Sequence, residues 1–321
     1  MSQSPRFLAP FEQGSLEPAS STLVIRPPDA RGLEALGTVT IEQGFFPLCQ
    51  FFEAAGFTVM PRAEGRFGMV LVHLTRSKAE NLSNIARATA MSDGIVLVNG
   101  AKTDGIESLL KAVKKITPVD VMSKAHGKVF WFEATAMPQE WIDAGKLAPN
   151  YAGFQTAPGM FSYESVDKGS ALLAPYLVGL KGRVADLGAG WGWLAAQALG
   201  EDVSEIVLFE AEHAALEAAK ANLPDPRAQF IWADVQALPK TTPFDVVISN
   251  PPFHQGRAAQ PEIGIGFINT AASLLAPKGR FLMVANRQLP YERALDARFR
   301  KVEMLAQTAG FKLFEASLPK R

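Results

Sequence analysis

Residues 246–254 combine an apolar, strand-like run with side chains that can bind a planar ring carrying an amine. Pro251 and Pro252 follow Asn250, and because proline cannot donate to a strand ladder or sit inside a helix, the pair ends the strand and stiffens the chain. Asn250 then offers an amide oxygen, Pro251 a backbone carbonyl and Phe253 a flat aromatic face. These groups suit a planar ring with an exocyclic amine, because the amine donates to the oxygens and the ring stacks on the phenyl group.

A glycine-rich turn follows Asp186, which stands near the end of another apolar segment. Gly188, Gly190 and Gly192 let the backbone turn tightly and approach a ligand without a Cβ atom in the way. The spacing is Gly-x-Gly-x-Gly, whereas dinucleotide-binding turns have Gly-x-Gly-x-x-Gly, and the carboxylate would repel a pyrophosphate at close range. Asp186, Gly188 and Gly190 therefore indicate a site for a cationic amino-acid ligand.

Two further carboxylates follow later strand-like segments. Glu210 comes 24 residues after Asp186, at a strand end where an acidic side chain can accept both ribose hydroxyls of a nucleoside; the alternative is a solvated carboxylate. Asp234 follows the next segment and would accept an adenine amino group; the alternative is a helix cap or turn residue. Both are therefore candidate contacts for a nucleoside ligand.

Other side chains near these segments give weaker signals. His254 directly follows the Asn-Pro-Pro-Phe run and either shapes the substrate pocket or is a hydrogen-bonded turn residue. Trp191 and Trp193 are more typical of core packing than of ligand contact, so we assign them no role. The four histidines and Cys49 have no metal-ligand spacing, so no metal site is expected.

The second half of the chain alternates strand-like and helix-like segments regularly. Strands are expected at residues 183–187, 206–210, 228–232, 245–249, 280–285, 302–307 and 311–317. Helices are expected from the glycine turn to about residue 199 and at residues 214–222, 263–275 and 289–298. This alternation predicts a parallel, doubly wound sheet. Only three residues separate the last two strands, too few for a parallel crossover, so these strands should pair antiparallel near an edge.

The first half predicts a less regular α/β domain. Apolar side chains have helical spacing at residues 77–90 and 103–116, strand-like runs occupy 94–98 and 128–133, and no glycine-rich turn follows a strand. The connecting region, residues 137–160, holds three prolines and several glycines, which places the domain boundary near residue 150. We therefore expect an N-terminal domain over 1–150 and a second domain over 151–321, with residues 1–20 as a loose arm.

Composition narrows the class of protein. The 321 residues carry a formal net charge of zero and a single cysteine, which excludes an internal disulfide framework and fits a reducing compartment. We expect a soluble cytoplasmic protein, since the N-terminus lacks the order of a signal peptide and no apolar run is long enough to span a bilayer. Residues 278–321 hold ten basic and four acidic side chains, which form either a solvated surface or a phosphate-contacting patch.

The motifs together resemble a known family. The glycine turn with Asp186, then Glu210, Asp234 and the Asn-Pro-Pro-Phe run, occur in order at successive strand ends, as in class I S-adenosyl-L-methionine-dependent methyltransferases. Residues 159–162 and 167–170 are similar to the opening segment of the small methyltransferase domain. The extended run Ser249 to Gly256, with residues 284–286 and 289–291, is similar to bacterial ribosomal RNA guanine-N2 methyltransferases that act on small-subunit RNA.

This resemblance carries expectations of fold and activity. It implies a C-terminal Rossmann-like domain with a seven-stranded, mostly parallel sheet and an antiparallel last strand. The N-terminal half would be a degenerate methyltransferase-like α/β domain without a cofactor site. The activity would be transfer of a methyl group to guanine N2 in 16S rRNA. Alternatives are a guanine of the large subunit, adenine N6, a protein glutamine, or a non-catalytic ribosome-binding relative.

The resemblance also assigns roles to residues. Asn250, Pro251 and Phe253 would be catalytic, Phe161 and His254 would contact substrate, and the remaining candidates, with Asn250, would hold S-adenosyl-L-methionine: Asp186, Gly188, Gly190, Glu210 and Asp234. Its partner would be ribosomal RNA or the small ribosomal subunit, with no membrane and no metal. A monomer is favoured.

Overall fold

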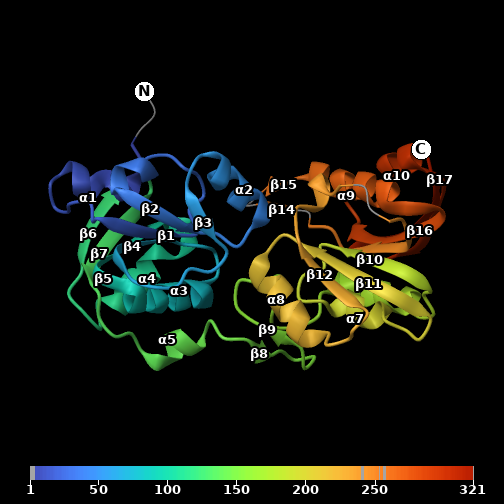
Figure 1. Ribbon diagram of the computed structural model, residues 1–321, viewed down its shortest axis with the longest axis horizontal. Coiled ribbons are helices and arrows are strands. Elements are labelled where there is room, and N and C mark those ends of the chain that lie inside the picture. The colour runs from blue at the N-terminus through green and yellow to red at the C-terminus, as the bar shows by residue number, and fades with distance from the viewer. Residues whose placement is uncertain (1–3, 240–241, 253, 256–257, 321) are drawn as a thin grey trace. The chain divides into compact units, whose positions relative to one another are not determined.

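The computed structural model describes residues 4–239, 242–252, 254–255 and 258–320. The chain forms two compact units (Figure 1). The first unit comprises Met1–Leu147 with Ala157–Gly159. The second comprises Ala148–Thr156 with Met160–Arg321, so the connecting segment is shared between them.

The second unit is built on a seven-stranded sheet in the order β12-β11-β10-β13-β16-β18-β17. Its strands are β10 (Gly182–Leu187), β11 (Val203–Glu210), β12 (Ala228–Trp232), β13 (Phe244–Ser249), β16 (Leu275–Asn286), β17 (Phe299–Gln307) and β18 (Phe311–Pro319). All neighbours from β12 to β16 are parallel, whereas β18 pairs antiparallel with both β16 and β17. The expected doubly wound sheet and its antiparallel end are confirmed.

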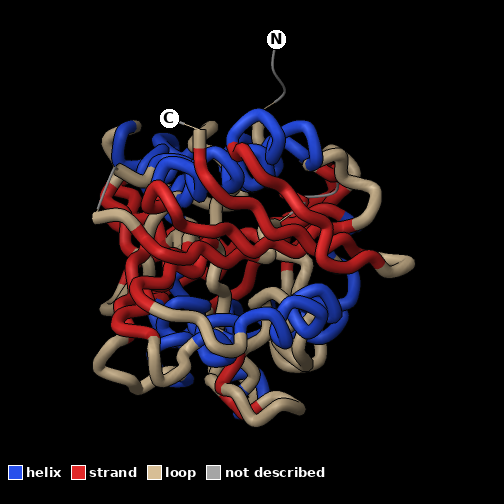
Figure 2. Tube along the Cα trace, turned by 90° about the vertical axis from the view of Figure 1, so that its right-hand side faces the viewer, coloured by secondary structure: helices blue, strands red, loops and turns tan. Residues whose placement is uncertain are grey.

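Helices cover both faces of this sheet (Figure 2). One face packs against α6 (Lys168–Leu173), η4 (Ala174–Leu177), α7 (Trp193–Ala198) and α8 (His213–Asn222). The other packs against η5 (Val235–Ala237), α9 (Pro261–Leu274) and α10 (Glu292–Arg298). Successive strand residues point to opposite faces, so Val246 enters one core and Val247 the other. Burial on both faces explains why these strands are almost continuously apolar in sequence.

The first unit repeats this topology strand for strand, in the order β3-β2-β1-β4-β5-β7-β6. Its strands are β1 (Ser21–Ile25), β2 (Thr38–Glu42), β3 (Thr58–Met60), β4 (Phe67–His73), β5 (Ser92–Ala101), β6 (Asp120–Lys124) and β7 (Gly127–Glu133). Its helices are η1 (Arg6–Leu8), α1 (Ala9–Glu12), η2 (Leu33–Leu36), α2 (Phe46–Ala54), α3 (Lys78–Met91), η3 (Lys102–Asp104), α4 (Ile106–Val113) and α5 (Gln139–Asp143). The expected methyltransferase-like α/β layout of this half is confirmed.

Short two-residue strands complete the second unit: β8 (Ala148–Pro149), β9 (Gln155–Thr156), β14 (His254–Gln255) and β15 (Ala258–Ala259).

In the first unit, the helix expected at residues 103–116 is shorter than predicted. It begins at Ile106 because Gly105 has a left-handed φ of 81°, which separates η3 from α4. Among the helices that the structure describes, none is long and apolar enough to cross a membrane.

The expectation of a loose arm at the N-terminus is wrong for the residues described there. Phe7 is buried and belongs to one of the two cores of the first unit. The Arg6 guanidinium donates hydrogen bonds to the carbonyls of Lys124 and Ala125 and to the side chain of Asn99. The Ser and Pro content suggested disorder, but one buried aromatic ring and one arginine attach the segment to the β6–β7 end of the sheet.

Candidate active site

The glycine turn after β10 adopts backbone conformations that only glycine takes up readily. Gly188, Gly190 and Gly192 have φ values of 72°, 56° and 86°. A Cβ atom on Gly188 would approach the Phe267 ring to 3.0 Å, whereas one on Gly190 would meet no atom within 4 Å. Gly188 is therefore required by packing as well as by backbone conformation, while Gly190 borders open space.

Asp186 is a fully buried carboxyl group directly before this turn. Neither of its oxygens has a hydrogen bond of ordinary geometry to a described residue. Burial first, and then the nearby charge of Glu210, raise the pKa of Asp186 to about 8, with a weak opposing effect from the backbone of Ala195. An unpaired buried carboxyl group is costly unless a partner compensates it, so this position is suited to a cationic ligand group.

Glu210, the last residue of β11, is tied to the glycine turn. Its Oε2 accepts a hydrogen bond from the Gly190 amide at 2.7 Å, and its Oε1 accepts one from the Glu212 amide at 2.7 Å. Burial raises the pKa of Glu210, and the two amide hydrogen bonds act in the opposite direction. Each carboxylate oxygen keeps a second lone pair, which leaves the group able to accept further hydroxyl donors.

Asn250 lies just past β13, and its side-chain amide is held from one side. Its Nδ2 donates to Asp167 Oδ2 and to Ser170 Oγ, both at 2.9 Å. Pro251, the next residue, is buried, so the chain leaves the strand through a packed proline. Because both amide protons are used in these contacts, Oδ1 is the atom of Asn250 that remains for a ligand.

A pocket at this edge of the sheet brings several of these residues together. Gly188, Gly190 and Asn250 line it, together with Phe161, whose side chain is 60% exposed. Residues that we had not selected for the site also line it, among them Asp167, Ser170, Trp191 and Trp193. The described lining includes none of the three acidic candidates, since Asp186 is buried beneath the turn and Glu210 and Asp234 lie outside.

Trp191 was assigned no role from sequence, yet it connects the glycine turn to the segment that carries Phe161. Its Nε1 donates to the Phe161 carbonyl at 2.9 Å, and its own carbonyl accepts from Asn222 Nδ2 at 2.9 Å. The indole is buried and lies against Phe154. A tryptophan within a glycine-rich turn is visible in the sequence and could have marked Trp191 as a site residue. Its hydrogen-bond partner, the Phe161 carbonyl, can be identified only from the tertiary structure.

Three candidate residues remain: Asp234, Phe253 and His254. Asp234 is half-buried and caps η5, where its Oδ1 accepts from the Gln236 amide at 2.9 Å. This is the cap role given above as the alternative, and among the described residues the other oxygen, Oδ2, has no hydrogen-bond partner. Phe253 lies outside the described residues, and for His254 only the backbone, in β14, is described. Over the described part of the chain, no group of three or more His, Cys, Asp or Glu is placed to hold a metal ion.

The register of the first sheet shows which residues stand at equivalent positions in the first unit. Ile25 pairs with Glu42 and with Val72, just as Leu187 pairs with Phe209 and with Ser249. By this register the four site positions Asp186, Gly188, Glu210 and Asn250 correspond to Val24, Arg26, Gln43 and His73. Two local features match as well. Arg26 has a positive φ of 58°, as Gly188 does, and Gln43 Oε1 accepts from the Phe45 amide, as Glu210 Oε1 accepts from the Glu212 amide.

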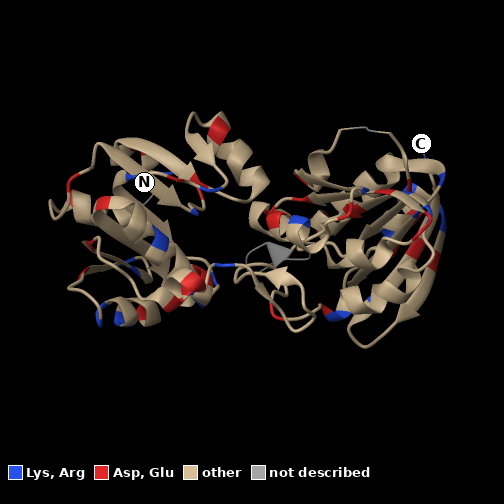
Figure 3. Cartoon of the chain, turned by 60° about the horizontal axis from the view of Figure 1, so that its bottom comes forward, with Lys and Arg blue, Asp and Glu red and all other residues tan. Residues whose placement is uncertain are grey.

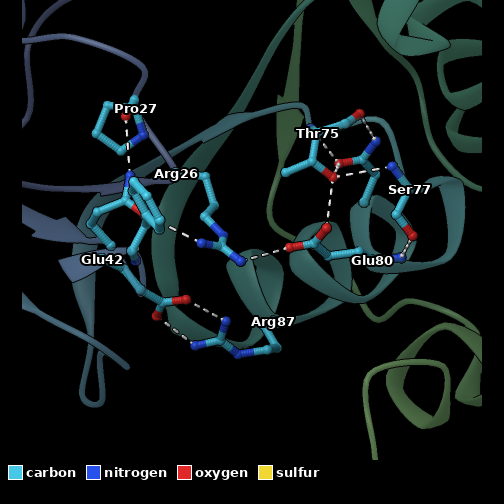
Figure 4. A network of polar contacts seen from close by, with 10 residues as sticks. Arg26, Pro27, Glu42, Thr75, Ser77, Glu80 and Arg87 are labelled. Carbon is cyan, nitrogen blue, oxygen red and sulfur yellow. Dashed lines mark hydrogen bonds and ion pairs between the residues drawn. The ribbon is translucent and has the colours of Figure 1, made fainter. Parts of the chain in front are cut away.

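Ion pairs occupy the equivalent edge of the first unit. Arg87 makes a bidentate pair with Glu42, with both N–O distances 2.7 Å, and Arg26 pairs with Glu80 at 3.1 Å (Figure 4). Arg26 also donates to Gln43 Oε1. The side chains at the positions of Gly188 and Glu210, namely Arg26 and Gln43, therefore contact each other directly.

The basic C-terminal segment is partly neutralised. Arg280 pairs with Glu315, Lys301 with Glu303 and Lys312 with Glu292. Figure 3 shows basic and acidic residues interspersed over this part of the chain. These pairs use three of the ten basic and three of the four acidic side chains, so the segment keeps its excess of positive charge, and the phosphate-contacting patch stays a prediction.

A parallel sheet with an antiparallel final strand, a glycine turn after its first strand and an acidic residue at the end of its second define a class I methyltransferase domain. The methyltransferase small domain family model matches residues 152–315. The ribosomal RNA small subunit methyltransferase C of Shewanella sp. (strain MR-4) is 30% identical over 267 residues, which cover 78% of this chain and 77% of that protein. The protein of that name from Psychromonas ingrahamii is 30% identical over 278 residues, covering 80% and 78%.

A solved structure resembles the whole chain. The T. thermophilus 16S rRNA N2 G1207 methyltransferase (RsmC), in complex with AdoMet and guanosine, is 26% identical, with a TM-score of 0.80 over 98% of this chain and 92% of that one. The chain belongs to the ribosomal RNA small subunit methyltransferase C family, and its second unit to the methyltransferase small domain family. The family resemblance noted in the sequence is confirmed.

Proposed function

We propose that this protein transfers a methyl group from S-adenosyl-L-methionine to the exocyclic N2 of a guanine in 16S rRNA. The observation that carries the proposal is the pocket that joins Gly188 and Gly190 to Asn250, with the unpaired Asp186 carboxyl group beneath the turn. The relatives named as small-subunit rRNA methyltransferases support the substrate class. The guanine named for the T. thermophilus protein is the first nucleotide to test.

The donor set fits S-adenosyl-L-methionine. The cofactor has a cationic amino-acid end, and the orphaned carboxyl group of Asp186 supplies the complementary charge beside the Gly188–Gly190 backbone. Glu210 keeps lone pairs for ribose hydroxyls, and the free oxygen of Asp234 would accept the adenine amine. When bound, the cofactor supplies a methyl group on a sulfonium centre.

Asn250 and Pro251 would prepare the acceptor nitrogen. The lone pair of a guanine amine is delocalised into the ring, which makes it a weak nucleophile. Asn250 Oδ1 and the Pro251 carbonyl would accept its two N–H groups, hold the nitrogen in line with the methyl group, and stabilise the positive charge that develops on it. These contacts need no proton transfer to the protein in the displacement itself.

Aromatic side chains would hold the base. Phe161 is 60% exposed at the pocket, and Trp191 holds its backbone carbonyl, so its ring is available to stack on a base. Phe253 and His254, at the end of the Asn-Pro-Pro-Phe run, would also contact the base. A base in a helix cannot reach such a pocket, so it must be unpaired or flipped out.

We assign catalysis to residues 151–321 and a supporting role to residues 1–150. The first unit lacks the equivalents of Asp186, Gly188 and Glu210 and fills that edge with the Arg87–Glu42 and Arg26–Glu80 pairs. The protein would act as a monomer on the small ribosomal subunit, and hence in the cytoplasm, with unpaired basic side chains contacting phosphates.

The test is methyl transfer from labelled S-adenosyl-L-methionine to small subunits, large subunits and stripped RNA, followed by digestion to nucleosides. Label in N2-methylguanosine of small-subunit RNA is the expected result. Label in large-subunit guanosine, N6-methyladenosine or a protein glutamine would replace the proposed acceptor with one of the alternatives. Cofactor binding without label in any substrate would favour a non-catalytic ribosome-binding protein.

A further inference from the structure

Asn250 can serve as an acceptor only if its amide faces the right way. An asparagine side chain presents an oxygen on one side and a nitrogen on the other, and free rotation would present either to the pocket. In this structure the nitrogen side is held by two residues of the α6 start, Asp167 and Ser170, which also line the pocket. Resting on the proposed function, we infer that Asp167 and Ser170 are positioning residues for methyl transfer, which fix Asn250 with Oδ1 toward the acceptor amine.

Asp167 determines the direction of the amide. A carboxylate oxygen only accepts, so the atom of Asn250 that lies 2.9 Å from Asp167 Oδ2 must be the nitrogen. The reverse orientation would place two oxygens against each other at that distance. Ser170 Oγ accepts the second amide proton at 2.9 Å, which completes the nitrogen side.

The carboxylate is itself held in place by the backbone. Asp167 is the N-cap of α6, and the same Oδ2 accepts the Ser170 amide at 2.9 Å. Gly169 between them is buried, and a Cβ atom there would lie 2.9 Å from Asp167 Oδ2 and 2.9 Å from the Phe311 ring. The Asp-Lys-Gly-Ser sequence thus combines a cap, a glycine that leaves room for the carboxylate, and a hydroxyl acceptor.

The charge of Asp167 adds to its orienting effect. A carboxylate that accepts from the amide nitrogen draws positive charge onto the N–H side and leaves Oδ1 more negative, because successive hydrogen bonds polarise one another. A more negative Oδ1 binds the acceptor amine more strongly as that nitrogen becomes positive. Asp167 therefore acts on the reaction through Asn250 and does not touch the reacting atoms.

Kinetic constants of four variants test this inference. Asp167→Ala should lower kcat about 100-fold, as when a fixed polar group is removed from a transition-state contact. Ser170→Ala should lower kcat about 10-fold, whereas Ser170→Thr, which keeps the hydroxyl, should stay within about 3-fold of the unchanged protein. Asp167→Asn keeps an acceptor oxygen without the charge and should fall between Asp167→Ala and the unchanged protein.

Cofactor affinity separates positioning from binding. The Kd of S-adenosyl-L-methionine should change less than about 3-fold in all four variants, because the lost contacts act on Asn250. A parallel loss of affinity and kcat in Asp167→Ala and Ser170→Ala would overturn the inference and make both residues cofactor contacts. An unchanged kcat in Asp167→Ala would overturn it as well.

Loss of a helix cap is a separate effect, and the chain offers a matched control. Ser77 caps α3 in the first unit, where its side chain accepts the Glu80 amide. Ser77→Ala should lower the melting temperature to a similar extent as Asp167→Ala while leaving kcat unchanged. If Ser77→Ala lowered kcat as much, loss of stability and not positioning would explain the Asp167 result.

The side-chain amide of Asn250 gives a readout that does not depend on activity. Its ¹⁵N–¹H₂ signals can be assigned by their absence in Asn250→Asp, and both should move and exchange faster with water in Asp167→Ala. Signals that stay in place would contradict the inference. If the unchanged protein fails to methylate guanine but the signals respond, the proposed substrate is wrong while the positioning of Asn250 stands.

Discussion

Glu210 Oε2 lies 2.7 Å from the amide nitrogen of Gly190 and accepts its hydrogen bond. The carboxylate at the end of β11 thereby fixes the turn that follows β10, so the group expected to bind ribose and the backbone expected to bind the methionine end form one unit. A substitution of Glu210 should therefore alter the conformation of the glycine turn, and a change in the turn should displace the Glu210 carboxylate.

Glu210→Gln should test this connection. A glutamine has one acceptor oxygen, so it can keep either the Gly190 or the Glu212 hydrogen bond but not both. We expect the Kd of S-adenosyl-L-methionine to rise about 10-fold or more, the effect of losing one hydrogen bond to a charged group, as measured by calorimetry. Glu217→Gln on the exposed side of α8 is the control and should leave Kd unchanged. Equal values for both variants would refute the connection.

Asn250→Ala should separate catalysis from cofactor binding. The substitution removes the Oδ1 acceptor while leaving Asp186, Glu210 and the glycine turn in place. Turnover should fall about 100- to 1,000-fold, the range for removing one preorganised polar group at a reaction centre. The Kd of S-adenosyl-L-methionine should change little. Methyl-transfer assays give the turnover, and calorimetry on the same preparation gives the Kd. A comparable loss of turnover and of cofactor affinity would count against the catalytic assignment of Asn250.

Cofactor affinity should depend on pH through Asp186. Its pKa of about 8 in the free protein means that the carboxyl group carries a proton at pH 7, and a cationic ligand favours the ionised form. Binding therefore releases a proton, so Kd should decrease as pH rises from 6 to 8, by at most about tenfold per unit, and level off above that range.

Two measurements check the pH prediction. Calorimetry in two buffers with different ionisation enthalpies should show proton release at pH 7. In Asp186→Asn the affinity should be weak and independent of pH. A flat profile for the unchanged protein between pH 6 and 8 would show that the ligand's positive charge does not lie beside Asp186.

The buried pair in the first unit should matter for stability and not for cofactor binding. Arg87→Met leaves the Glu42 carboxylate buried without its partner, which should lower the unfolding free energy of that unit by about 3–5 kcal/mol. Arg31→Met, which breaks an exposed pair with Asp29, should leave the unfolding free energy nearly unchanged, because solvent screens such pairs. Denaturant titration gives both values.

The same preparations test whether the first unit binds cofactor. Titration of the unchanged protein should give one S-adenosyl-L-methionine per chain, and Arg87→Met should keep that stoichiometry and affinity at temperatures where it is folded. Two bound molecules per chain would show that the first unit retains a site despite Val24 and Arg26.

Much of the catalytic fold could be predicted from sequence because the pattern there is regular. The strand expected at residues 228–232 is β12 to the residue, and the three-residue connection before Phe311 required the antiparallel pairing that β17 and β18 show. The N-terminal arm was misjudged because its Ser and Pro content hides one buried ring, Phe7, and one multiply bonded side chain, Arg6.

The sequence alone determined the residue types that the site needs. The order of glycine turn, Glu210 and Asn-Pro-Pro-Phe follows from strand ends that must meet at one edge of a parallel sheet, and no tertiary information was needed to select Asn250. Only the tertiary structure decided which way Asn250 faces, because its partners Asp167 and Ser170 lie 83 and 80 residues earlier in the chain. It also decided that Trp191 donates to the Phe161 carbonyl and that Arg87 pairs with Glu42 in the first unit. Hydrogen bonds over such separations leave no periodic trace in sequence, since they depend on how the strands and helices pack and not on local spacing.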